Sequence, residues 1–91
     1  MSVSAGTTEA EIWRRTIRPE VGDLAPEEAR VLLRWSLSPA DRDRVRNLSG
    51  KASAGSLTPE ESNELDSYLT VGSALEFLKA KARLSLRREN W

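Results

Sequence analysis

The stretch that decides the fold is LTPEESNELDSYLTVGSALEFLKAKARLSLRR, residues 57–88. It opens with a hydroxyl at an N-cap position, Thr58, followed by Pro59 at the first helical position and by Glu61 three residues after the cap. This combination is typical of a helix start. The apolar residues that follow recur at helical spacing, and no proline interrupts them. We therefore expect one long helix over about residues 59–88, about 45 Å in length.

A helix of this length exceeds the diameter expected for so small a domain. Its C-terminal half must either fold back on earlier helices or meet another molecule. The apolar stripe of that half contains Leu75, Leu78, Ala82 and Leu86, and we expect a partner to cover part of it. Gly72 is the weakest point of the helix, because glycine costs about 1 kcal/mol relative to alanine in a helix interior. It is also a place where another helix could approach closely.

Three shorter helices are expected before the long one. A capping box that begins at Thr8 starts the first, and Pro19 stops it. Pro26 starts the second, and the pair Ser38-Pro39 starts the third. No run of alternating β-branched residues competes with these helices.

The end of the third helix has two readings. It ends near Ser49 if Gly50 breaks it, or it continues to Ala54 with Gly55 as the residue after its end. We favour the second reading. The fold class predicted is all-α: a flexible N-terminus over residues 1–7, then a single four-helix domain over residues 8–91, in which the third and fourth helices form a hairpin.

Composition excludes several kinds of chemistry. The chain has 91 residues and contains neither cysteine nor histidine. A thiolate nucleophile, a Ser-His-Asp arrangement and the usual transition-metal ligands are therefore absent. Carboxylate, serine and lysine side chains remain, but their spacing specifies no catalytic constellation. We expect no enzyme, no catalytic residues, no metal and no cofactor.

Location is inferred from what the sequence lacks. No run of 18 apolar residues occurs, so we expect no membrane-spanning segment. The first residues, MSVSAG, contain neither the basic nor the apolar region of a secretory signal. The expected location is the cytoplasm.

Charge is arranged in blocks although the formal net charge is zero. The blocks carry −3 over residues 1–29, +4 over 30–55, −5 over 56–76 and +4 over 77–91. Acids at helix starts and bases at helix ends complement the helix dipole, and a basic third helix suits a hairpin with the acidic start of the fourth. The last block has no acidic block after it, so it could meet phosphate or an acidic protein surface. Its bases spread over several faces, which favours a solvated helix surface.

Three tryptophans occur in the chain. Trp13, beside Ile12 and Ile17, is expected in the core. Trp35 lies off the apolar face of the second helix, so we expect it to be half exposed, either packed on the core or in contact with a partner. Trp91 could dock on the fold or on a partner, and the sequence leaves both readings open.

Several stretches resemble a group of small bacterial proteins. They are Gly22-Asp23-Leu24, GSLTPEE over residues 55–61, LDSY over 65–68, Val71-Gly72, and KAKARLSL over 79–86. Members of this group are often encoded beside an endonuclease of the HNH type. The resemblance implies an accessory or regulatory partner of a nuclease. The chain is not itself that nuclease, because the HNH motif needs histidine.

Two functions remain after these exclusions. The first is a non-catalytic protein-interaction module that binds another protein, such as an HNH-type nuclease, or itself. The alternative is a weak nucleic-acid-binding protein that uses the basic C-terminal helix. The residues expected to contact the partner are Trp35, Leu75, Leu78, Arg83 and Arg87.

Overall fold

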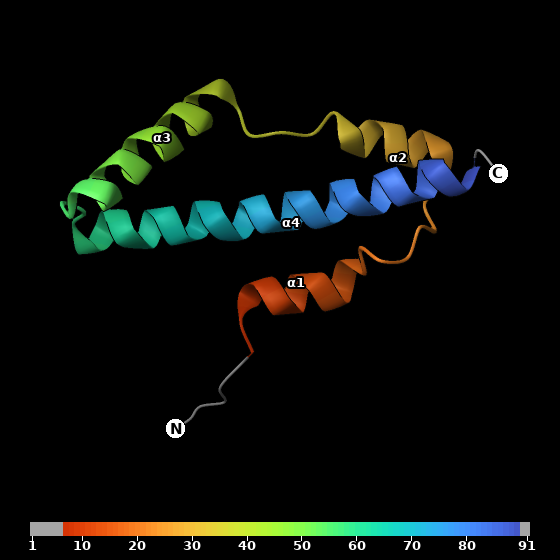
Figure 1. The fold of residues 1–91 in the computed structure, drawn as a ribbon, viewed down its shortest axis with the longest axis horizontal. Coiled ribbons are helices and arrows are strands. Elements are labelled where there is room, and N and C mark those ends of the chain that lie inside the picture. The colour runs from red at the N-terminus through yellow and green to blue at the C-terminus, as the bar shows by residue number, and fades with distance from the viewer. Residues whose placement is uncertain (1–6, 90–91) are drawn as a thin grey trace. The chain divides into compact units, whose positions relative to one another are not determined.

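A computed structural model describes residues 7–89 of the chain, which form four α-helices and no strand. The helices are α1 (Glu9–Ile17), α2 (Pro26–Leu33), α3 (Pro39–Ala54) and α4 (Pro59–Glu89) (Figure 1). The predicted all-α fold with a long C-terminal helix is confirmed. The predictions about residues 1–6 and about Trp91 lie outside the described residues. Within residues 7–89, no helix combines the length and the apolar character needed to cross a bilayer.

Local hydrogen bonds fix the helix starts. The first turns of α1 and α4 both carry a capping box, in which a threonine hydroxyl and a glutamate carboxylate each accept a backbone N–H bond from the other residue. The N-cap of α2 is Ala25, which has no side-chain acceptor. There the Glu28 carboxylate accepts from the Ala25 N–H at 2.8 Å. A single carboxylate therefore stabilises a helix start that has no polar cap.

The helix ends also follow from local geometry. α3 continues through Gly50 to Ala54, and Gly55 adopts the left-handed conformation with φ of 70°. The preferred prediction for the end of α3 is therefore confirmed. α4 continues through Gly72 without a break. A side chain at Gly72 would meet nothing within 4 Å, so the close approach of another helix at this point is not found.

Residue contacts divide the chain into two units. Unit 1 consists of residues 1–35 and 73–91, and unit 2 consists of residues 36–72. The helix α4 contributes its N-terminal half to unit 2 and its C-terminal half to unit 1. The prediction of a single domain stays a prediction.

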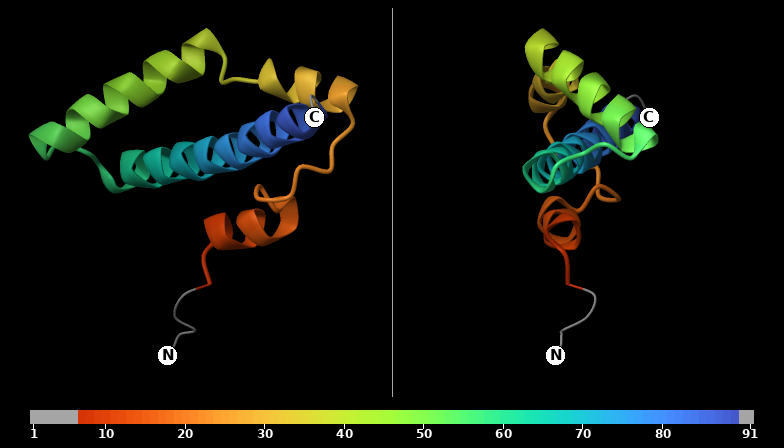
Figure 2. Two further views of the ribbon diagram at one scale, coloured as in Figure 1. Left: turned by 45° about the vertical axis from the view of Figure 1, so that its right-hand side comes forward. Right: turned by 90° about the vertical axis from the view of Figure 1, so that its left-hand side faces the viewer.

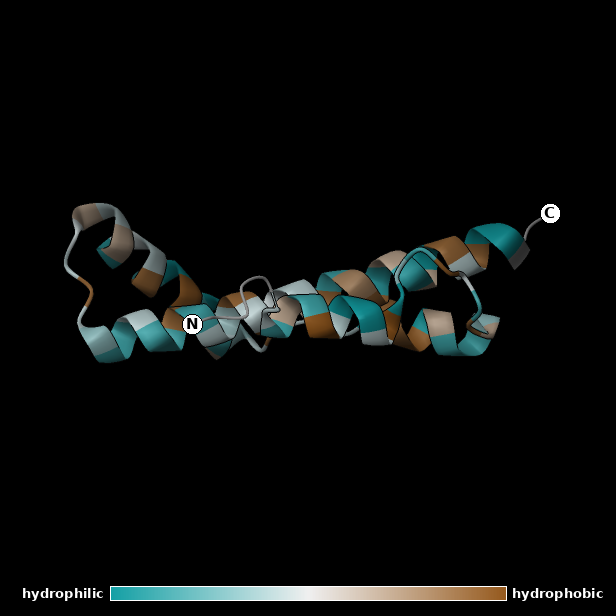
Figure 3. Cartoon of the chain, turned by 90° about the horizontal axis from the view of Figure 1, so that it is seen from below, coloured by the Kyte–Doolittle hydropathy of each residue, from teal (hydrophilic) through white to brown (hydrophobic). Residues whose placement is uncertain are grey.

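Unit 1 places α1 and α2 on opposite sides of the C-terminal half of α4 (Figures 1 and 2). Its buried apolar residues are few and mostly small: Ile17, Ala29 and Ala82. Hydrophobic and hydrophilic residues alternate along the helices (Figure 3), as expected for helices that bury one face. Ala82 is already buried within the chain, so no partner is needed to cover it.

Unit 2 is the helical hairpin predicted from the sequence. Polar contacts join α3 to the N-terminal half of α4, and the basic side chains of α3 meet the acids of α4. The pairs are Arg44 with Glu61 and Glu64, and Lys51 with Glu61. This confirms the arrangement inferred from the charge blocks. Leu48 is the one large side chain that is completely buried in the part of the chain that the structure describes.

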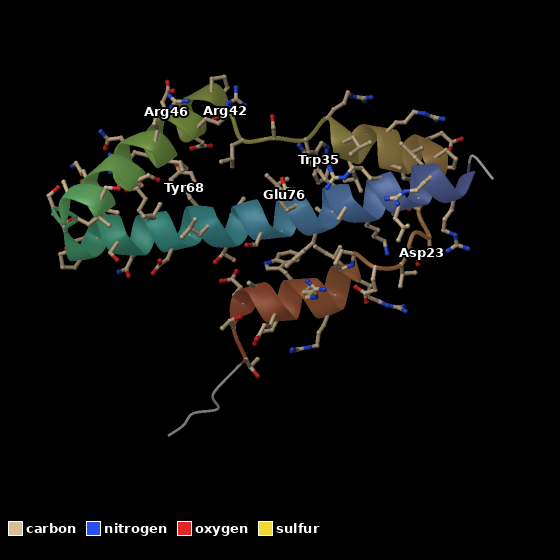
Figure 4. The ribbon with its side chains drawn as sticks, in the orientation of Figure 1. Asp23, Trp35, Arg42, Arg46, Tyr68 and Glu76 are labelled. Carbon is tan, nitrogen blue, oxygen red and sulfur yellow. The ribbon has the colours of Figure 1, made fainter. Side chains whose placement is uncertain are left out.

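Tyr68 adds a polar contact to the hairpin. Its hydroxyl donates to Asp41 Oδ1 at 2.7 Å, and Figure 4 shows the side chain directed towards α3. This hydrogen bond and one from Ser38 hold the pKa of Asp41 below its ordinary value. The hydroxyl of this half-buried ring therefore has a carboxylate acceptor on the neighbouring helix.

The hairpin is expected to lose stability in acid through Glu61. The Lys51 ammonium and the Thr58 N–H stabilise its carboxylate and lower its pKa from the ordinary 4.5 to about 2. The unfolded chain therefore takes up this proton first, and the contribution to stability present above pH 4.5 disappears as the pH falls towards 2. Urea unfolding of wild type and of Glu61→Gln at several pH values measures this. A wild type as acid-sensitive as Glu61→Gln would contradict the assignment.

Candidate functional site

A short segment between α1 and α2 lies directly on α4. Gly22 approaches so closely that a Cβ atom there would lie 2.9 Å from the carbonyl carbon of Leu84 and from the amide nitrogen of Ser85. The next two residues bind side chains of the same helix. Asp23 Oδ1 lies 2.7 Å from Lys81 Nζ, and the Leu24 N–H donates to Ser85 Oγ at 3.1 Å. We call Gly22-Asp23-Leu24 the docking segment, because it packs against α4 through all three residues.

Lys81 is the best buried charge in unit 1, with an exposed fraction of 8%. Its ammonium contacts the Asp23 carboxylate and donates to the Arg18 carbonyl at 3.4 Å. The hydrogen bond from Lys81 in turn holds the pKa of Asp23 below its ordinary value. Lys81 was expected on a solvated cationic surface, and that expectation is wrong. A partner for it exists earlier in the chain, at a position that the charge blocks did not reveal.

Ser85 links the docking segment to α4. It is buried, its Oγ accepts from the Leu24 N–H, and its hydroxyl donates to the Lys81 carbonyl at 2.8 Å. The two buried polar side chains of this cluster, Lys81 and Ser85, thus both have partners within unit 1, as buried polar groups require. The cluster joins the docking segment to α4.

α1 contacts α4 through a cation and a ring. The Arg14 guanidinium carbon lies 5.6 Å from the centroid of the Phe77 ring, within the range of a cation–π contact. Ile17 of α1 is buried. The side of α1 that faces α4 thus carries Arg14 and Ile17.

Ile12 and Trp13 of α1 are both exposed. The exposed fraction of Trp13 is 41%, so its predicted place in the core is wrong. Ile12 and Ile17 are five residues apart, which on a helix separates them by well over a quarter turn. Ile12 therefore points away from Ile17. Trp13, however, lies one helical turn before Ile17, so helical spacing places it on the same side of α1 and did not predict its exposure.

The five residues expected to contact a partner lie in unit 1. Trp35 follows the end of α2 and is 50% exposed (Figure 4), which confirms the predicted half exposure. Leu75 and Leu78 are both half-buried on α4, whereas Arg83 and Arg87 are exposed. Arg83 lies 3.9 Å from the Glu76 carboxylate, one exposed side chain beside another. Exposed pairs of this kind contribute little to stability, so Arg83 can exchange this partner for another.

Unit 2 carries an open hollow that the sequence did not indicate. Its volume is about 260 Å³, and its lining comes from α4: Glu64, Ser67, Tyr68 and Val71. The exposed fraction of Val71 is 49%. Leu69, on another side of the same helix, is 57% exposed and lies outside the lining. The lining residues are three, four and seven positions apart, so they share one helix face. This spacing can be read from the sequence, but it does not predict that the face is hollowed.

Among residues 7–89, no group of three acidic side chains is placed to hold a metal ion. The candidate site residues described above are half-exposed apolar and basic side chains. Comparisons with models of protein families, with curated proteins and with solved structures found no match.

Proposed function

We propose that this chain is a non-catalytic, helical protein-interaction module. The observation that supports the proposal is the half exposure of two tryptophans, Trp13 and Trp35, on unit 1. Tryptophan is enriched among the residues that dominate the binding energy of protein interfaces. Single exposed aliphatic residues are common on protein surfaces and need no explanation. Large aromatic rings contribute much more binding energy when a partner covers them.

The small core supports the same proposal. Within the described residues of unit 1, the buried apolar side chains are one isoleucine and two alanines. Covering apolar area contributes about 25 cal/mol per Å², before the costs of association. A partner that covers the exposed apolar side chains would therefore add stabilisation that the chain does not obtain alone.

The partner proposed first is an HNH-type endonuclease in the cytoplasm, on the strength of the resemblance described above. The module would act as its accessory or regulatory protein. Trp35, with Arg83 and Arg87, is proposed to contact it, and the half-buried Leu75 and Leu78 are proposed to contribute at the edge of the contact.

Loss of Trp35 is expected to weaken this interaction. We expect a tagged chain, co-expressed with an HNH-type endonuclease of its source organism, to retain the nuclease on an affinity column. Trp35→Ala should reduce the retained amount by roughly tenfold or more, because truncating a central aromatic contact commonly costs that much. Leu69→Ala, which removes an exposed leucine from unit 2, is the matched control and should retain the nuclease. Absence of the nuclease from the wild-type eluate would contradict the proposed partner.

One observation favours nucleic acid as a second candidate ligand. Unit 1 contains ten of the 14 basic residues of the chain, and it also carries the two half-exposed tryptophans. A combination of basic and aromatic side chains suits single-stranded nucleic acid. The phosphates of the strand can pair with the Lys and Arg side chains, and its nucleobases can stack on the tryptophan rings. Digestion of nucleic acid before the affinity step separates the candidates. A protein contact survives the digestion, whereas a nucleic-acid bridge does not.

A further inference from the structure

A basic and apolar surface lies on α2 in unit 1. Val31 and Trp35 are one helical turn apart and both are half exposed. Arg30 and Arg34 are likewise one turn apart, directly beside them, and both are exposed. The Trp35 N–H donates to the Leu32 carbonyl at 3.1 Å, which continues the last turn of the helix to Trp35. We name the surface formed by Arg30, Val31, Arg34 and Trp35 the α2 stripe.

An acidic and apolar surface lies on α4 in unit 2. It is the hollow lined by Glu64, Ser67, Tyr68 and Val71, which we name the α4 hollow. Glu60 is exposed one turn before Glu64, so it extends the same face. Tyr68 and Val71 form the apolar end of this face, and the two glutamates form its acidic end.

The two surfaces are complementary in charge. Unit 1 contains ten basic and eight acidic residues, a formal charge of +2, whereas unit 2 contains four basic and six acidic residues, a formal charge of −2. Locally, two arginines lie beside the apolar residues of the α2 stripe, and Glu60 is exposed at the acidic end of the α4 hollow. Glu64, at the same end, is already paired with Arg44 of α3, so Glu60 is the acid that a basic partner would meet first. Opposite charges around a contact favour the correct register and disfavour the contact of like surfaces.

The size of the hollow also suits a side chain of the α2 stripe. A hollow of about 260 Å³ has room for one large side chain, and Trp35 is the largest exposed side chain on the α2 stripe. Interface anchors are commonly aromatic residues that enter such a hollow. We propose that a second copy of this chain docks here, with Trp35 of one copy seated in the α4 hollow of the other.

A second copy is the occupant that these observations favour. Every copy supplies one α2 stripe and one α4 hollow, so the complementary surface is present at the same concentration as the chain. This self-association goes beyond the proposed function. A nuclease can bind a chain that does not self-associate, and a self-associating chain need not bind a nuclease.

Self-association is tested by measuring the molecular mass with sedimentation equilibrium over roughly a hundredfold range of protein concentration. We expect the mass of the wild type to rise above that of one chain as concentration increases. Trp35→Ala and Val71→Glu should each weaken the association constant by roughly tenfold or more, because each removes one side of the same contact. Added salt should weaken it as well, because the flanking charges are exposed.

Two matched variants control for nonspecific effects. Trp13→Ala removes a similarly exposed tryptophan from α1, and Leu69→Glu introduces the same charge on α4 outside the hollow. Both should associate like the wild type. Circular dichroism checks that all four variants keep their helices. Equal weakening in the controls would overturn the proposed contact.

Mixing the two defective variants gives the sharpest result. Trp35→Ala retains an intact α4 hollow, and Val71→Glu retains an intact α2 stripe. Each variant alone should associate more weakly than the wild type by roughly tenfold or more, but an equimolar mixture should form a heterodimer through the one intact pair of surfaces. A mixture that stays monomeric, or a wild type that stays monomeric at every concentration, would overturn the proposal. The proposed function is tested by co-purification of the nuclease, which is a different measurement. Failure of self-association therefore does not decide whether the chain binds the nuclease.

Discussion

Replacing Gly22 by alanine is expected to lower the free energy of unfolding by about 1–3 kcal/mol. The new Cβ atom would lie 2.9 Å from the carbonyl carbon and the Cγ atom of Leu84 and from the amide nitrogen of Ser85. Two of these atoms belong to the backbone of α4, which cannot rotate away as a side chain can. The docking segment must therefore move away from α4. This movement weakens the ion pair between Asp23 and Lys81 and the hydrogen bond from the Leu24 N–H to Ser85. Urea unfolding followed by circular dichroism measures the loss.

Gly72→Ala is the matched control, and its effect should have the opposite sign. A side chain at this position meets nothing within 4 Å, and the residue lies inside α4. Alanine should therefore raise the free energy of unfolding by about 0.5–1 kcal/mol through helix propensity alone. If Gly22→Ala also stabilised the protein, the segment from Gly22 to Leu24 would not lie on α4 as described.

Leu48→Ala is expected to lower the free energy of unfolding by about 2–5 kcal/mol. Leu48 is completely buried, and it is the one large side chain of which this is true among the described residues. Its truncation removes apolar contacts and leaves a cavity in the core of the hairpin. Thermal or urea unfolding measures the change.

Leu69→Ala provides the comparison for Leu48→Ala. The same chemical change is made at a side chain that is 57% exposed, so we expect the free energy of unfolding to change by less than about 0.5 kcal/mol. Because both variants make the same change from leucine to alanine, the difference between their free energies of unfolding measures the effect of burial alone. Equal effects would show that the hairpin does not pack around Leu48.

The candidate site was only partly predictable from the sequence. The half exposure of Trp35 followed from its position off the Leu32 and Leu33 face, and the structure confirms it. Trp13 was placed wrongly, because it is 41% exposed although it lies one helical turn from the buried Ile17, and spacing alone does not show how far a neighbour covers a helix face. The α4 hollow depends on how the hairpin side chains pack, so helical spacing alone does not reveal it.

The sequence by itself determined the helices and the hairpin. The hydrogen bonds that cap the helix starts join residues three apart, such as Thr58 with Glu61 and Ser38 with Asp41. They can therefore be predicted from a few consecutive residues. Only the tertiary structure decided which charges and glycines are buried. Lys81 meets Asp23, and Gly22 meets Leu84, across some 60 residues of chain. Such contacts depend on which distant segment covers a helix face, and local patterns carry no information about that choice.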